Sequence, residues 1–570
     1  MKRNISNLSD VKADIQAKRT RNDNPHEKDN VVLKDSQNIT HSMNKIARIF
    51  NLETTFDKQL SLILSEISAN PKYYRCITYI LDDLSNIIHM LYPYRTINVY
   101  PFGSAVTGLA LKGSDVDLFV DFNGEIPEKF VQSLRKINYK ARLFFKLIYI
   151  PARIPIIRCE HKSRVPCDIS YSNFLGVANS NLIKYYLDVD SRLKPVILIL
   201  KFLMKTHGLV STNNITSFSI ILLTLFYVQQ LDEPLIPTAC ELQQLAANKH
   251  IVNNWNVSFT KDRDHTSRNT MSIPALITGF FKFYTNFEFG LYLISLFTGK
   301  SYLKSIFANQ NTIPIEFSHY TDNLINNRCD KFELHKFMCV QGPFNHAHNT
   351  TRNVNQKTLI NFQYFCQKNS QMLDNSQHND DGQFLKDLFS QKDMSIEKHP
   401  AVREAMVYIG ENIDFSMCTN VTEHALREHW ANITVDKFKD ILTEVLKCNV
   451  TTNNEKPSFG NEFRCLNCEL NYPELVTNIR KDAREEFNFP KDMPLIVKET
   501  LISDYLLEKR LKGFKQTHFK FNVQCSMLNG PTRIIFKLLC NESAKPKMHI
   551  IVSVFNFIQN SCVKWLQAVV

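Results

Sequence analysis

The spacing of apolar residues along this chain of 570 residues changes several times, and each change predicts a different kind of structure. From Leu60 to Tyr94, apolar residues recur at helical spacing, which predicts two amphipathic helices. Downstream, runs rich in β-branched and aromatic residues flank glycines and prolines, which is typical of strands and turns. We therefore expect a strand–turn–strand unit over 97–122, a helix near 128–137, and strands at 151–160 and 165–172.

From Asn179 to about residue 374 the apolar periodicity is mainly helical, and runs such as IILLTLFYV (220–228) predict buried helices. The apolar runs are too short to span a bilayer. We interpret residues 179–374 as an all-helical central domain that also includes the helices at 46–95. The predicted fold class is thus α+β, with a mixed-sheet domain at 96–178 inserted into the helical one.

Three remaining regions complete the predicted organisation. Residues 1–45 are polar and rich in asparagine, which predicts a disordered N-terminal tail, and the polar stretch 375–400 predicts a linker. The pattern of residues 401–570 predicts a small α+β module, which is a candidate RNA-binding unit. Its expected elements are helical stretches near 400–446 and 497–511, strands at 519–528, 532–540 and 548–557, and a terminal helix.

Composition narrows the class of partner. The formal net charge of +12 favours a polyanion such as RNA or DNA, although a basic surface alone would give the same charge. The 14 cysteines form no paired framework, and Cys465 and Cys468 lack the further ligands of a zinc site, which favours free thiols in a reducing compartment. Acidic residues near the N-terminus argue against a mitochondrial transit peptide, so we expect an intracellular protein, nuclear or cytoplasmic rather than mitochondrial. We separately predict a monomer.

The most informative motif is Gly103-Ser104 followed by Asp115-Val116-Asp117. Side chains alternate along a strand, so Asp115 and Asp117 project from the same face. Two adjacent carboxylates repel each other unless a cation lies between them, and oxygen ligands favour Mg²⁺ or Mn²⁺. Because a Gly-Ser turn can hold phosphate oxygens, the motif indicates nucleotidyl transfer.

Asp168 is the expected third carboxylate, since it lies in a later strand of the same predicted sheet. Three acids can hold two metal ions, one at a 3′-hydroxyl and one at a triphosphate. Each acid taken alone could also be an ordinary residue at a strand end or turn. We predict that Asp115, Asp117 and Asp168 are both catalytic and metal-binding.

These motifs resemble those of the DNA polymerase β nucleotidyltransferase superfamily. The downstream segments resemble the terminal RNA nucleotidyltransferases, which are template-independent poly(A) and poly(U) polymerases, and most of all the branch with the mitochondrial poly(A) polymerase and the speckle-targeted uridylyltransferase. Those segments include ARIPIIR (152–158), CDIS (167–170), DSRLKPVILILKF (190–202) and PLIPT (234–238). The resemblance implies the addition of nucleotides to RNA 3′ ends. The alternative is a catalytically inactive RNA-binding scaffold on the same fold.

The same resemblance implies a set of nucleotide contacts. Lys201 and Lys205, neighbours at i and i+4 on a helix, would hold the triphosphate, although a solvated basic face is the simpler interpretation without the family. The phenyl ring of Phe218 would stack on the base, although an ordinary core phenylalanine has the same spacing. Many homologues have tyrosine there. The predicted nucleotide-binding residues are Gly103, Ser104, Asn179, Ser180, Lys201, Lys205, Ser217, Phe218 and His348.

Base choice is assigned to QGPFNHAHNTTRNV (341–354), which resembles the nucleotide-recognition motif of the family. Uridylyltransferases carry a histidine before the asparagine, here His348, which can hydrogen-bond a uracil carbonyl and crowd a purine. Gly342 and Asn345 depart from the acids often found there. Discrimination by packing and one hydrogen bond is modest. We favour UTP over ATP as substrate and retain poly(A) polymerase as the alternative.

Overall fold

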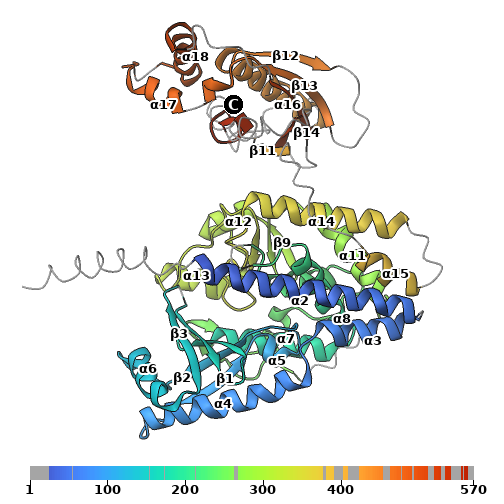
Figure 1. Ribbon diagram of the computed structural model, residues 1–570, viewed down its shortest axis with the longest axis vertical. Helices are drawn as coiled ribbons and strands as arrows, with labels where there is room; N and C mark the ends of the chain where they lie inside the picture. The colour runs from blue at the N-terminus through green and yellow to red at the C-terminus, as the bar shows by residue number, and fades with distance from the viewer. Residues whose placement is uncertain are drawn as a thin grey trace, which may run out of the picture. The chain divides into compact units, whose positions relative to one another are not determined.

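The computed structural model describes residues 25–53, 55–152, 154–172, 174–211, 214–261, 267–375, 381–390, 402–408, 423–453, 462–476, 478–490, 493–510, 519–527, 533–540, 554–555 and 557–562. The chain divides into two compact units, Met1–Met394 and Ser395–Val570 (Figure 1). Each unit has its own apolar core and is described separately.

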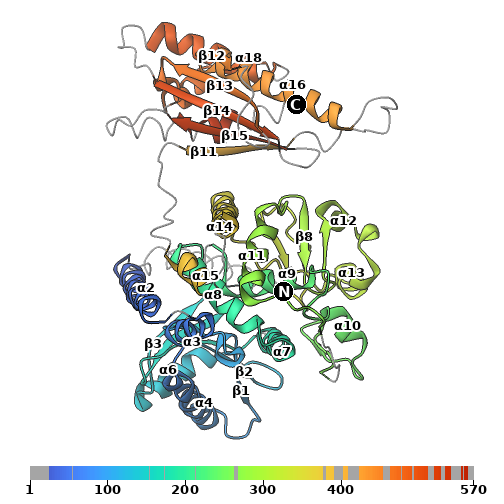
Figure 2. The same ribbon diagram turned by 90° about the vertical axis from the view of Figure 1, so that its right-hand side faces the viewer.

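A five-stranded mixed sheet organises one part of the first unit (Figure 2). Its strand order is β1-β2-β5-β4-β3; β2 and β5 are parallel, and the other pairs are antiparallel. The strands expected at 97–122, 151–160 and 165–172 are confirmed, whereas β3 was not predicted. The strands are β1 (Asn98–Phe102), β2 (Val116–Asp121), β3 (Phe144–Ile150), β4 (Ile156–His161) and β5 (Pro166–Ser170).

Helices α4 (Pro71–Leu91) and α6 (Phe130–Ala141) share an apolar core with this sheet. The stripe of α4 that includes Ile80, Leu84 and Ile87 is buried against strand residues such as Val116, Leu118 and Ile169. The sequence grouped residues 46–95 with the helical domain. The structure differs for α4, because its apolar stripe is buried against the sheet.

The rest of the first unit is mainly helical around one large core. Helices α8 and α9 are almost wholly apolar and buried, as their sequences predict. The helices are α7 (Leu175–Val189), α8 (Leu193–Thr206), α9 (Ser217–Gln229), α10 (Ala239–Gln244), α11 (Ile273–Thr285), α12 (Lys304–Ala308), α13 (Ser318–Ile325), α14 (Gln356–Asn375) and α15 (Asp381–Phe389). The short strands are β6 (Ile251–Val252), β7 (Trp255–Asn256), β8 (Tyr292–Ser295), β9 (Lys300–Leu303) and β10 (Cys339–Gln341).

Two segments expected to lack structure are helical. Helix α2 (Pro25–Leu52) includes residues 25–45 of the predicted tail at 1–45, and it packs with α3 (Phe56–Ile67) and α15 (Figure 1). Ile46 is 1% exposed, and Ser42 Oγ donates a hydrogen bond to Glu66 Oε1 (3.0 Å). A few apolar residues at helical spacing therefore outweigh the polar composition. Residues 1–24 of that predicted tail lie outside the described residues.

The predicted linker at 375–400 contains α15. Phe384, Leu385, Leu388 and Phe389 of this helix are all buried in the large core of the first unit. The linker interpretation is wrong for residues 381–389, because these four apolar side chains sit at helical spacing and cover one face of the core. The other residues of 376–400, apart from Ser390, lie outside the described part of the chain.

The second unit is a five-stranded sheet in the order β11-β15-β14-β13-β12, with α16 (Glu423–Asp440) in its core. All of its strand pairs are antiparallel. The strands are β11 (Val402–Tyr408), β12 (Cys448–Asn453), β13 (Glu462–Leu470), β14 (Phe519–Met527) and β15 (Arg533–Cys540). The other α-helices in the described part of this unit are α17 (Asn478–Glu485) and α18 (Leu495–Tyr505).

The predictions for this unit are confirmed only in part. The strands at 519–528 and 532–540 and the helix at 497–511 are present as β14, β15 and α18. Residues 402–408 form a strand where a helix was expected, because the whole segment pairs antiparallel with β15. Most of the strand predicted at 548–557 lies outside the described residues. Cys465 and Cys468 lie three residues apart on β13 and so face opposite sides of the sheet, which does not suit a shared zinc ion.

Within the described residues, no helix has the length and apolar character required to cross a membrane.

Candidate active site

Strand register brings the three predicted carboxylates together. Asp117 of β2 lies directly opposite Asp168 of the parallel neighbour β5, and Asp115 stands two residues before Asp117. Their carboxylate oxygens lie within 4.8 Å of one another. Tyr73 fixes the start of β2, because its hydroxyl donates a hydrogen bond to the carbonyl of Asp115 (2.8 Å).

The Gly-Ser turn lies against this cluster. Gly103 has a φ of +68° and a ψ of −143°, a conformation open to glycine, and a Cβ on it would overlap Asp117 Oδ2. Ser104 begins the short helix α5 (Ser104–Thr107). Ser180 Oγ accepts a hydrogen bond from the Gly103 N–H and donates one to the Gly176 carbonyl, both at 2.7 Å. Ser180 therefore holds the turn against α7, and its predicted contact with the nucleotide stays a prediction.

Arg158 of β4 completes the cluster. It lies directly opposite Asp168, and its Nε and Nη2 donate hydrogen bonds to the two carboxylate oxygens at 2.9 and 2.8 Å. Removal from water and the nearby Asp168 raise the pKa of Asp115. Burial, Asp115 and Asp168 raise the pKa of Asp117 well above its usual value, and Arg158 partly offsets this rise. The three acids thus repel one another, and a cation between them would relieve that repulsion.

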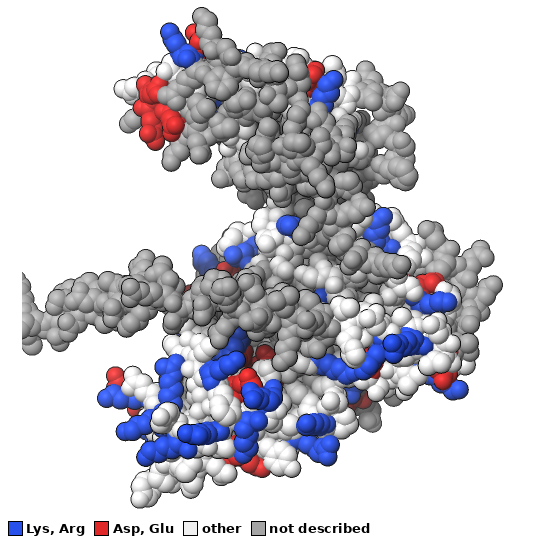
Figure 3. All heavy atoms as spheres, in the orientation of Figure 1, with Lys and Arg blue, Asp and Glu red and all other residues white. Residues whose placement is uncertain are grey.

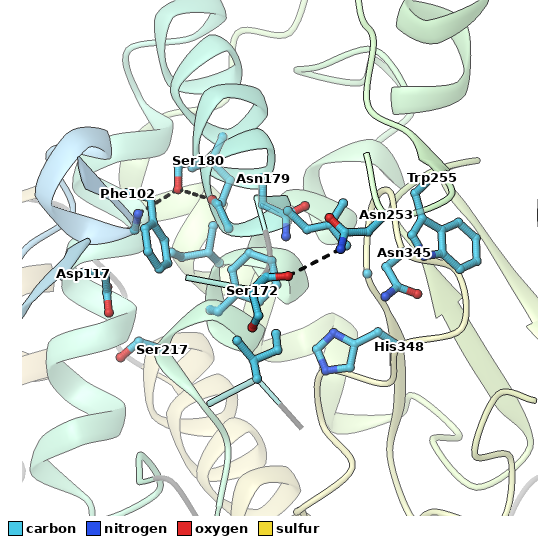
Figure 4. A pocket seen from close by; sticks show the side chains of 18 of the residues that line it. Phe102, Asp117, Ser172, Asn179, Ser180, Ser217, Asn253, Trp255, Asn345 and His348 are labelled. Carbon is cyan, nitrogen blue, oxygen red and sulfur yellow. Dashed lines mark hydrogen bonds between the residues drawn. The ribbon is translucent and has the colours of Figure 1, made fainter. Parts of the chain in front are cut away.

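The carboxylates line one end of a cavity of about 900 Å³. Figure 4 shows Asp117 and Ser217 on one side of this cavity and His348, Asn345 and Trp255 on the other. An elongated ligand can therefore place a charged end at the carboxylates and a planar end near His348. Of the predicted site residues, those that line the cavity are Gly103, Ser104, Asp115, Asp117, Asn179, Ser180, Lys201, Ser217, Phe218 and His348.

The two predicted lysines have different surroundings. Lys201 is 3% exposed, lines the cavity and donates a hydrogen bond from Nζ to the Leu109 carbonyl (2.6 Å). Burial, and next Lys205, lower the pKa of Lys201 to about 8. Lys205 is outside the cavity lining, although its charge acts to lower the pKa of Asp115. Lys201 is thus the better placed of the two to meet a phosphate inside the cavity.

Polar groups between the two ends come from α7 and α9. The side-chain oxygen Oδ1 of Asn179 is buried and has no hydrogen-bond partner among the described residues, so it presents an acceptor to the cavity. Ser217 and Phe218 occupy the first turn of α9, which Thr216 caps by accepting a hydrogen bond from the Ser219 N–H. Phe218 is partly buried against the large core, so one part of its ring remains for the cavity.

His346 and His348 have separate environments. His348 lines the cavity, whereas His346 is 4% exposed and packs against the rings of Trp255, Phe297 and Phe317. Burial lowers the pKa of His346 to about 3, so it is neutral at ordinary pH. The pair therefore provides one histidine for a ligand and one for the core.

The sequence did not identify several residues of the site. One signal was available for Arg158, because the polar residues Arg158 and Glu160 alternate with the apolar residues Ile157 and Cys159 in IIRCE (156–160), which predicts that Arg158 lies on the polar face of its strand. Asn253, Trp255, Arg328 and Asp330 line the cavity from loops and short strands, where no periodicity indicates a facing direction.

The donor set fits a divalent cation. Asp115, Asp117 and Asp168 offer oxygen ligands on neighbouring strands, and within the described residues they are the one cluster of three acids, histidines or cysteines with this spacing. Hard cations such as Mg²⁺ and Mn²⁺ prefer oxygen ligands.

This arrangement of a mixed sheet, an adjoining helical region and a carboxylate triad has the nucleotidyltransferase fold of the DNA polymerase β type. Residues 56–188 match the family model described as "Poly(A) RNA polymerase, mitochondrial-like, central palm domain". The mtPAP chain solved in complex with ATPgammaS has a TM-score of 0.51 and 22% identity, covering 62% of this chain and 74% of that one. The mtPAP chain solved with UTP also has a TM-score of 0.51, at 22% identity, covering 61% and 75%.

Curated relatives include polymerases named for either base. The human mitochondrial poly(A) RNA polymerase is 23% identical over 370 residues, which cover 58% of each protein. Terminal uridylyltransferase cid1 of Schizosaccharomyces pombe is 26% identical over 328 residues, 55% of this chain and 77% of that protein. This chain thus spans little more than half the length of the human relative. Its relatives and its structural neighbours are nucleotidyltransferases.

Proposed function

We propose that this protein is a terminal nucleotidyltransferase that adds nucleoside monophosphates to RNA 3′ ends, with UTP as the preferred substrate. The observation that carries the proposal is the convergence of Asp115, Asp117 and Asp168 at one end of a cavity whose other end holds His348. The mixed-sheet domain is inserted between helical segments, and the cavity takes residues from both. The acceptor is a single RNA 3′ end, and the protein acts as a monomer.

The side chains that line the cavity can each contact a different part of the bound nucleotide. The nucleotide enters with its triphosphate toward the carboxylates, where Lys201 and Ser104 neutralise and hydrogen-bond phosphate oxygens. Asn179 Oδ1 accepts a hydrogen bond from the ribose, and Phe218 stacks on the base. Bound Mg²⁺ or Mn²⁺, held by the three aspartates, would supply Lewis-acid activation of the 3′-hydroxyl and of the triphosphate. Asp168 accepts the proton of the RNA 3′-hydroxyl, the 3′ oxygen bonds to the α-phosphorus, and pyrophosphate leaves with the electrons of the broken P–O bond.

His348 supports the preference for uracil. Its side chain lies at the end of the cavity away from the carboxylates, beside Asn345 and Trp255 (Figure 4). An imidazole N–H there can donate to a uracil carbonyl, and the ring reduces the room for a purine. The expected discrimination is about 10–200-fold, the range for a small difference in packing in an apolar pocket.

The experiment is incubation of the purified chain with a labelled short RNA, Mg²⁺ or Mn²⁺, and each nucleoside triphosphate separately. We expect extension with UTP and none in the Asp115→Asn/Asp117→Asn double variant, with thermal unfolding as the check on its fold. Preferential use of ATP would refute the base assignment. Absence of extension with every triphosphate, together with retained RNA binding, would support the inactive scaffold instead.

A further inference from the structure

The row of residues that carries the carboxylates crosses the whole sheet. Five residues lie directly opposite one another in the order Phe102, Asp117, Asp168, Arg158 and Ile148, one from each strand. Directly opposed residues project from the same face of a sheet. The face that carries the carboxylates therefore continues outward over β4 and β3.

That outer face is unusually apolar for an edge strand. Phe145 is 43% and Ile148 is 48% exposed, and both project on the face of Arg158, because Phe145 pairs with Glu160 and Ile148 with Arg158. Exposed apolar side chains on an edge strand favour unwanted pairing, so such a strand usually has a function. Ile154, in the β3–β4 connection, is 39% exposed and lines the catalytic cavity. The apolar face is thus continuous with the cavity wall.

The segment 129–164, which contains β3 and β4, carries most of the net charge of the protein. Residues 129–164 contain ten lysines or arginines and one acidic residue, a net charge of +9 against +12 for the whole chain. Figure 3 shows Lys and Arg atoms gathered over the part of the first unit where α6, β3 and α4 lie. Three of these cations have acidic partners, Lys162 with Asp83, Arg164 with Glu160 and Arg158 with Asp168. Lys146 of β3 is exposed, and the register of β3 shifts beside it.

Arg158 lies between the carboxylate cluster and the apolar face of β3. Its Nε and Nη2 are bonded to Asp168, its Nη1 has no hydrogen-bond partner among the described residues, and half of its side chain is exposed. Neighbouring strands lie about 4.8 Å apart, so β3 is about 10 Å from β5, roughly the length of one or two nucleotides of an extended strand. A phosphate beside Arg158 would place its neighbouring bases over β3.

We propose that Phe145, Lys146, Ile148, Ile154 and Arg158 form an acceptor strip, which binds the last nucleotides of the RNA strand whose 3′ end is extended. Apolar side chains contact the bases, and the cations contact the phosphates, a combination typical of single-stranded nucleic acid binding. The strip rests on the proposed function, since it assigns a surface to the RNA substrate of that reaction. It accounts for both the exposed apolar edge and the concentration of charge.

The test measures RNA affinity without any nucleoside triphosphate, by fluorescence anisotropy of a labelled oligouridylate with the full chain. We expect Ile148→Glu and Lys146→Glu each to weaken RNA binding about tenfold, and Lys146→Glu to reduce the salt dependence by about one ion. The matched controls are Ile315→Glu, at an isoleucine that is 82% exposed, and Lys58→Glu, at a lysine whose side chain is 69% exposed. We expect both controls to bind RNA as the wild type does, and all four variants to keep its UTP affinity.

A second measurement covers the case in which a variant fails to fold. An RNA with 4-thiouridine at its 3′ end should cross-link to peptides within residues 144–158 of the wild type. Unchanged RNA affinity in both strip variants, or cross-links confined to Ser395–Val570, would overturn the proposal. So would self-association that Ile148→Glu abolishes while RNA affinity stays constant, because β3 would then be a protein interface. RNA binding through the strip without nucleotide incorporation would refute the proposed function alone.

Discussion

Gly103→Ala tests the geometry on which the whole site depends. The alanine must adopt a φ of +68° and a ψ of −143°, a region that costs residues other than glycine about 1–3 kcal/mol. Its Cβ would also overlap Asp117 Oδ2, so the turn or the carboxylate must move. A displaced ligand or supporting group typically weakens metal binding about 10–100-fold, and we expect a loss of that size.

Gly113→Ala is the matched control for Gly103→Ala. Gly113 has a φ of +81°, yet a Cβ there would meet no atom within 4 Å. It should cost about 1–2 kcal/mol of stability from backbone strain and leave the carboxylates in place. The assay is Mn²⁺ binding, followed by electron paramagnetic resonance of the free ion, with urea unfolding for stability and nucleotide incorporation for activity. If Gly103→Ala bound Mn²⁺ as tightly as Gly113→Ala, the proposed link between the turn and Asp117 would be refuted.

Three further changes test other parts of the first unit. Lys201→Met removes the buried cation of the cavity and should raise the KM for UTP about 10–100-fold, the loss of one charge-assisted hydrogen bond, in steady-state assays; an unchanged KM would exclude Lys201 from triphosphate binding. His346 stays neutral in the fold down to a pKa of about 3 but titrates near 6.5 when unfolded, so it lowers stability as pH falls through that window, by about 2 kcal/mol at pH 5. His346→Leu should remove that part of the pH dependence in urea unfolding at pH 5 and pH 7, and equal slopes for both proteins would contradict the assignment. Asn138→Leu leaves the Phe144 N–H and carbonyl without their partner and should cost about 2–4 kcal/mol, whereas Tyr139→Ala, at an 83% exposed residue, should cost far less.

The carboxylate triad was predictable because its signal is local. The alternation of a strand places Asp115 and Asp117 on one face, and a third acid in a later strand needed only the right neighbour. The pairing of β2 with β5 supplies that neighbour, and this pairing is set by the tertiary structure and not by the local sequence. Arg158 was missed for the same reason, since its partner depends on β4 lying on the other side of β5.

The errors in the fold arose where few apolar residues decide the structure. Helices α2 and α15 lie in polar segments, and only a handful of side chains, such as Ile46, Phe384 and Leu388, hold them to the core. Composition averages over such residues and favours disorder. The sequence predicts a helix at β11, whereas the strand forms there through pairing with β15, which the local sequence does not encode.

The proposed acceptor strip would also explain how a site with three carboxylates attracts RNA. The triad by itself would repel a phosphate backbone, and Arg158 and Lys201 offset only part of its charge. Lys146 lies two strands away from Asp168, at about 10 Å, which is close to the screening length of about 8–10 Å at physiological salt. The basic edge can therefore hold the RNA backbone where the field of the carboxylates has largely decayed, while the 3′ end alone reaches inward. If RNA binds at the proposed strip, one sheet face would hold the cation at the carboxylates and the polyanion at its basic edge.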